Sequence, residues 1–75
     1  MERYMNRGGD SGVSEYEIGT DFIKIKFKTS SPIYVYSNMK TGQQHVEAMK
    51  QLAISGHGLQ AYINRHKTMR FDKER

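Results

Sequence analysis

The side chains of this sequence best suited to acid–base chemistry or metal binding are three histidines, His45, His57 and His66. No two of them have the four-residue spacing that places two zinc ligands on one helix face, and no carboxylate motif accompanies them. The chain has no cysteine, so it forms neither a disulfide nor a thiolate metal site. We therefore expect surface or capping histidines, no metal, no cofactor, no catalytic residue and no enzymatic activity.

The serines and glycines allow two further kinds of chemistry. A serine–histidine–acid arrangement is spatial and leaves no fixed spacing in a sequence. Four of the serines, Ser30, Ser31, Ser37 and Ser55, occupy positions typical of turns and helix caps. The run Gly56-His57-Gly58 resembles part of a phosphate loop, yet no Lys-Ser or Lys-Thr follows it and no strand precedes it. A tight joint between two helices is the simpler interpretation, although the amides that open the second helix can hold an anion.

Basic side chains are the stronger signal. Lys24, Lys26 and Lys28 alternate with apolar residues, and this period of two is typical of a half-buried β-strand with its lysines on one face. The last eleven residues carry five cations and two carboxylates, a net charge of +3. Cations that gather on one face or at one helix end are typical of contacts with nucleic-acid phosphates. The candidate nucleic-acid-binding residues are Lys24, Lys26, Lys28, Arg65, Lys67 and Arg70.

Two alternative functions are consistent with these features. As a nucleic-acid-binding module, of RNA or DNA, the protein should lose affinity steeply with salt and lose binding when the three strand lysines become Glu. Alternatively, it is a protein-interaction module, such as an inhibitor, an adaptor or a self-associating subunit. The candidate contacts with a partner protein or a second copy are Ile33, Val35, Met69 and Phe71. The tail cations can also have a purely structural role, in which they complement a helix dipole and keep the protein soluble.

A β-hairpin must position the lysines. Its strands are residues 22–28 and the β-branched and aromatic run 33–36, with turn formers between them. If the loop is residues 29–32, Lys28 pairs with Ile33, and Tyr34 and Tyr36 point into the core. A loop one residue shorter or longer reverses every side chain and puts the tyrosines beside the lysines, as a stacking platform for bases. Pro32, which cannot donate to the ladder, favours the four-residue loop.

A third strand and two helices complete the predicted fold. The strand is residues 13–18, where Tyr16 and Ile18 share one face and Val13 lies on the other. The first helix begins at a capping box, Thr41 to Gln44, and ends at Gly56, which can take the left-handed conformation. The second begins at Leu59 and meets no helix-breaking residue before the C-terminus. Apolar residues recur at helical spacing in both: Val46, Met49, Leu52 and Ala53, then Leu59, Tyr62, Ile63 and His66.

The order of these elements predicts an α+β fold, a three-stranded antiparallel β-meander with two C-terminal helices packed on one face (β-β-β-α-α). Seventy-five residues suffice for one domain, which we expect at residues 13–66. Residues 1–12 are expected to be a disordered lead-in, and residues 67–75 a basic tail that can continue the last helix. With a net charge of +4, no signal peptide and no membrane-length apolar run, we expect a soluble, cytoplasmic protein with no membrane partner.

The pattern Tyr34-x-Tyr36 after an Ile-x-Ile-x-Phe strand, the helix end Ala53-Ile54-Ser55-Gly56 and the run 59–66 together resemble the KTSC domain. This family comprises small α+β modules that occur alone in bacteria and phages and at the C-terminus of some lysyl-tRNA synthetases. The resemblance covers residues 12–66 and implies the fold, and the family has no settled activity. Two departures are the turn at 29–32, where the family usually has Gly, and Asn38-Met39, near which it tends to have Pro.

Overall fold

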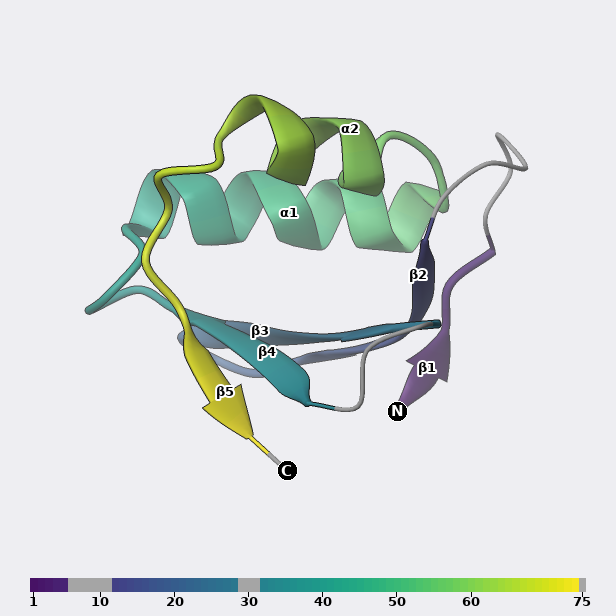
Figure 1. The fold of residues 1–75 in the computed structure, drawn as a ribbon, viewed down its shortest axis with the longest axis horizontal. Helices are drawn as coiled ribbons and strands as arrows, with labels where there is room; N and C mark the ends of the chain where they lie inside the picture. The colour runs from purple at the N-terminus through teal and green to yellow at the C-terminus, as the bar shows by residue number, and fades with distance from the viewer. Residues whose placement is uncertain (6–11, 29–31, 75) are drawn as a thin grey trace.

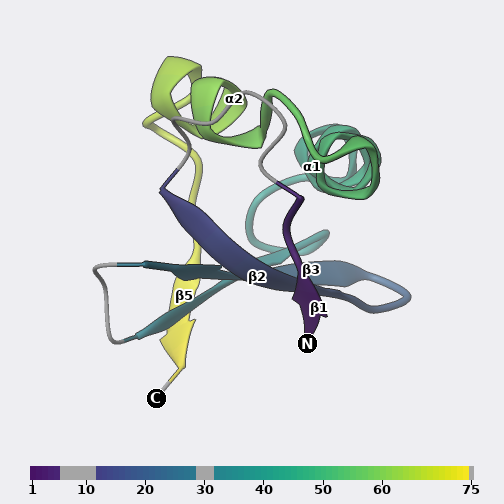
Figure 2. The ribbon, with the colours of Figure 1, turned by 90° about the vertical axis from the view of Figure 1, so that its right-hand side faces the viewer.

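The computed structural model describes residues 1–5, 12–28 and 32–74 as one antiparallel sheet covered by two helices. Both helices lie on the same face of the sheet, and no described segment covers the opposite face, which we call the open face (Figures 1 and 2). The strands follow each other in chain order across the sheet: β1 (Glu2–Arg3), β2 (Val13–Ile18), β3 (Phe22–Phe27), β4 (Ile33–Ser37) and β5 (Asp72–Glu74). The helices are α1 (Gln43–Ser55) and α2 (Leu59–Arg65). This confirms the α+β class and the two helices on one face.

The prediction of three strands is wrong, because both ends of the chain add an edge strand. β1 pairs with β2, and β5 pairs with β4 through Val35 and Asp72 among others. A buried apolar side chain near each edge strand anchors that end of the chain. Tyr4, next to β1, is 4% exposed, and Met69, just before β5, is 8% exposed, and both belong to the core. α2 ends at Arg65, and the chain then returns to the sheet as a strand (Figure 1). Of the expected lead-in and loop, residues 6–11 and 29–31 lie outside the described residues, as does Arg75.

The hairpin of β3 and β4 points both tyrosines to the helices. Ile25 pairs with Tyr34 and Ile23 pairs with Tyr36, so that Tyr36 is 2% exposed. These are the faces predicted for the four-residue loop, but Ile33 pairs with Lys26 instead of Lys28. A shift of two residues moves the partners along the strand and leaves each side chain on its own face. The alternative register, with a tyrosine stacking platform on the open face, does not occur.

The predicted face of Val13 is wrong, because β2 contains a β-bulge. The pairing of β2 with β3 shifts between Val13 and Glu15, so one extra residue, Ser14, is inserted in β2. The insertion puts Val13 on the same side as Tyr16, although an unbroken alternation would separate them. Val13 is consequently 1% exposed and lies in the core with Ile23 and Ile25.

The first helix ends as predicted but begins differently. Gly56 follows its last residue in the left-handed conformation, with φ 74°, and its N–H reaches the carbonyls of Leu52 and Ala53. At the other end the predicted capping box does not form: Gly42 is the N-cap, and no side chain caps the helix. The Thr41 hydroxyl instead donates a hydrogen bond to the carbonyl of Arg70, because the C-terminal segment passes beside it.

The core lies between the helical layer and the sheet. Its fully buried members come from β2, β3, β4 and both helices, and the largest are Tyr36, Ile23, Ile25, Met49, Leu59, Val13 and Val46. Lys50 of α1 is also buried, and its ammonium donates to the Thr20 carbonyl and pairs with Glu47 at 3.1 Å. Among the described residues, no helix is long and apolar enough to cross a membrane.

Candidate nucleic-acid interface

The open face of the sheet carries charges of both signs. Residues paired across antiparallel strands point to the same side, so Arg3, Glu15, Lys26, Ile33 and Glu74 form one row across all five strands. A second row on this face contains Glu17, Lys24, Val35 and Asp72. In these two rows three cations stand among four carboxylates.

The predicted lysine stripe is therefore not a basic surface. Lys24 is bonded to both carboxylate oxygens of Glu74, at 3.0 and 3.2 Å, and the pairing partners of Lys24 and Lys26 on β2 are Glu17 and Glu15. Lys28 lies beyond the end of β3 and, with Arg3, lines a hollow at that end of the sheet. The neighbouring carboxylates reduce the attraction of this face for phosphate.

The four candidate partner-binding residues do not form one surface either. Ile33 and Val35 lie on the open face, half-buried between charged neighbours. Met69 is buried, and Phe71 is half-buried and packs on the two tyrosines of β4. The large apolar side chains that are exposed lie elsewhere, and three of them, Met1, Ile18 and Ile54, line one hollow beside β1 and β2.

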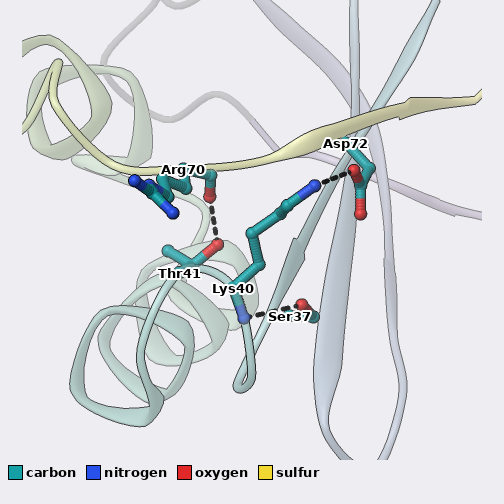
Figure 3. A network of polar contacts seen from close by, with 5 residues as sticks. All are labelled: Ser37, Lys40, Thr41, Arg70 and Asp72. Carbon is teal, nitrogen blue, oxygen red and sulfur yellow. Dashed lines mark hydrogen bonds and ion pairs between the residues drawn. The ribbon is translucent and has the colours of Figure 1, made fainter.

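A polar clasp holds the C-terminal segment against the rest of the fold (Figure 3). The turn between β4 and α1 supplies it: the Thr41 hydroxyl donates to the Arg70 carbonyl, and the Lys40 ammonium pairs with Asp72. The Lys40 N–H donates to the Ser37 hydroxyl at 3.2 Å, which fixes the turn itself. The clasp and the Lys24–Glu74 pair hold Asp72 and Glu74 of β5 on the open face of the sheet.

The alternation along β5 segregates charge. Asp72 and Glu74 lie on the open face, whereas Lys73 pairs with Tyr34 and lies on the helix side. Its ammonium is 5.7 Å from the centre of the Tyr34 ring. Arg65, Lys67 and Arg70 are exposed along the preceding segment. Among the described residues these three cations and Lys73 form no ion pair.

A groove with aromatic walls lies between α2, the segment that follows it and β4. Its volume is about 150 Å³, and it is lined by Tyr34, Tyr36, Ile63, Asn64, His66, Lys67, Met69 and Phe71. The rings of Tyr34 and Phe71 are stacked, with centroids 4.7 Å apart and planes 8° apart, and Tyr36 packs on Phe71 at 5.5 Å. Burial, and to a smaller extent the neighbouring Tyr34, raises the pKa of Tyr36 to about 12, so its phenol is uncharged at neutral pH. No carboxylate belongs to the described lining of this groove.

Two of the three histidines, His45 and His66, differ from the expectation of surface or capping residues. His45 of α1 and His66, just after α2, have ring centroids 5.0 Å apart, and Tyr62 bonds to His45 Nδ1 at 2.8 Å. The three half-buried rings pack the start of α1 against the end of α2. The described residues contain no group of three or more histidine or acidic side chains placed to hold a metal. His57 is exposed in the joint between the helices.

Comparison of the chain with models of protein families, with curated proteins and with solved structures gives no match. The resemblance to the KTSC domain therefore stays a prediction.

Of the sequence candidates, the structure places Lys67, Met69 and Phe71 in one groove. It separates them from Lys24 and Lys26 on the open face. Sequence reasoning missed Lys73 and the compensating carboxylates. The alternation Phe71-Asp72-Lys73-Glu74 is a weak strand pattern that could have indicated them, but it is short and contains a single apolar residue.

Proposed function

We propose that this protein is a non-enzymatic module that binds nucleic acid through the cations of its C-terminal segment, Arg65, Lys67, Arg70 and Lys73. The observation that carries the proposal is the segregation of charge along β5. Asp72 and Glu74 pair with Lys40 and Lys24, while Lys67 and Lys73 are left beside an aromatic groove without a carboxylate in its described lining. Exposed cations that are not paired with a carboxylate are those most available to phosphates.

Direct binding measurements test this proposal. Fluorescence anisotropy of a labelled single-stranded oligonucleotide and of its duplex, at two salt concentrations, should give an affinity that falls as salt rises. For single strands the slope of log affinity against log salt is about −0.7 for each phosphate contact. Lys67→Glu should weaken binding and make this slope shallower.

Lys26→Glu is the matched control, because it makes the same charge change at an exposed lysine of the open face. We expect it to weaken binding much less than Lys67→Glu. Equal losses in the two variants would mean that only net charge matters, which contradicts an interface at the C-terminal segment. No binding of any form at low salt would remove the proposal and leave the alternative from the sequence, an interaction with a protein partner or a second copy.

A further inference from the structure

We propose that the groove beside Tyr34 and Phe71 takes up one unpaired base of a single-stranded nucleic acid. This inference rests on the proposed function and adds the kind of nucleic acid and the part of it that is recognised. Phosphate contacts alone would not distinguish a single strand from a duplex, whereas a site for a base does.

The size of the groove suits one planar ring. Its volume is about 150 Å³, and an apolar cavity of about this volume in another protein takes up benzene. The base of a nucleotide in a duplex has both faces covered by its neighbours, so only an unstacked base can enter.

The aromatic wall is formed before any ligand arrives. Tyr34 is held by its pairing with Ile25 and by the edge of Phe27, whose ring centroid is 5.1 Å from its own. Phe71 is held between Tyr34 and Tyr36. A base that contacts this wall does so without first ordering the side chains, which keeps the entropic cost of binding low.

The polar groups of the rim complement a nucleotide. Lys67 lines the groove, and Lys73 lies by the Tyr34 ring, so phosphates next to an inserted base meet cations. Asn64 also lines the groove, and its carbonyl oxygen accepts a 3.2 Å hydrogen bond from the Gln60 amide. This leaves the Asn64 amide N–H groups to donate to the edge of a base.

The test compares two oligonucleotides with the same backbone charge. One is a labelled oligothymidylate, and the other has the same length with abasic tetrahydrofuran units in place of nucleotides. We expect the oligothymidylate to bind about 5-fold more tightly, the lower end of the range for stacking of one base, because the rings of Tyr34 and Phe71 already stack on each other and leave mainly their edges to contact a base. Equal affinities would overturn the inference and leave the proposed function intact. Failure of both probes to bind at low salt would overturn the proposed function as well.

A variant that fills the groove locates the base. Asn64→Phe changes an exposed rim residue and should lower the affinity for oligothymidylate to that for the abasic probe, without changing the latter. Gln51→Phe, at an exposed position of α1, is the matched control and should change neither affinity. Circular dichroism and thermal unfolding verify that both variants are folded. If folded Asn64→Phe keeps the full preference for bases, the bases bind elsewhere and the inference is wrong.

Discussion

The hydroxyl of Tyr4 accepts a 3.2 Å hydrogen bond from the backbone N–H of Leu59, the first residue of α2. The first N–H groups of a helix have no partner within it, and the N-cap of α2, Gly58, has no side chain to supply one. A residue from the N-terminal end of the chain therefore caps a helix near the other end. Because both residues are buried, water does not replace the bond.

Tyr4→Phe should lower the free energy of unfolding by about 1–3 kcal/mol, the cost of leaving a buried donor without a partner. Urea unfolding followed by circular dichroism measures this change. Met5→Ala, at a residue that is 61% exposed, is the control and should change stability by no more than about 0.5 kcal/mol. A Tyr4→Phe protein as stable as the parent would mean that the hydrogen bond has no energetic role.

Thr41→Val should loosen β5 without affecting the centre of the sheet. The substitution removes the hydroxyl that donates to the Arg70 carbonyl and keeps the shape of the side chain (Figure 3). The loss of one hydrogen bond, about 0.5–1.5 kcal/mol, corresponds to amide exchange about 2- to 13-fold faster in residues 72–74.

Hydrogen exchange followed by NMR checks this expectation, with the amides of β3 as the internal reference. Thr41→Ser retains the hydroxyl and should exchange like the parent. Faster exchange throughout the sheet in Thr41→Val would contradict a local role for the clasp.

Stability should fall at high pH because of Tyr36. Burial, and then the neighbouring Tyr34, raises the pKa of this phenol from 10.0 to about 12, so the folded protein keeps a proton that the unfolded chain loses. The stabilisation is complete below pH 10 and is lost as pH rises through 12, with a total of about 2–3 kcal/mol. Denaturant unfolding between pH 8 and 12 should give a shallower decline for Tyr36→Phe than for the parent. Identical declines would argue against this source.

Neutralising carboxylates of the open face should create a basic surface. In Glu15→Gln/Glu17→Gln, Lys24 and Lys26 lose the negative charges opposite them on β2. Two unit charges 4 Å apart in water interact by about 1 kcal/mol, so affinity for an oligonucleotide at low salt should rise by up to about fivefold per carboxylate.

Anisotropy titration measures this gain, which should become smaller as salt rises to about 0.15 M, where the screening length is about 8 Å. Asp21→Asn, in the turn between β2 and β3, removes one negative charge away from the open face and is the control for the gain expected per carboxylate. An unchanged affinity at low salt would show that the open face does not approach nucleic acid even when it is basic.

The sequence by itself determined the features that depend on local periodicity. The alternation around Ile23 and Ile25 specified which side of β3 is buried, and both are 0% exposed. The helical spacing of Val46 and Met49 specified the buried side of α1, and Gly56 specified its end. These patterns are reliable because each is set by the geometry of a single element.

Only the tertiary structure decided the number of strands, the position of Val13 and the charge of the sheet face. β1 and β5 are too short to show a periodicity, and they form because the buried Tyr4 and Met69 hold the chain ends at the sheet edges. The Lys24–Glu74 pair joins residues that are 50 positions apart, so no local pattern can predict it. Local spacing determines which side chains share a face of one strand, whereas pairing between distant segments determines which charges meet across the sheet.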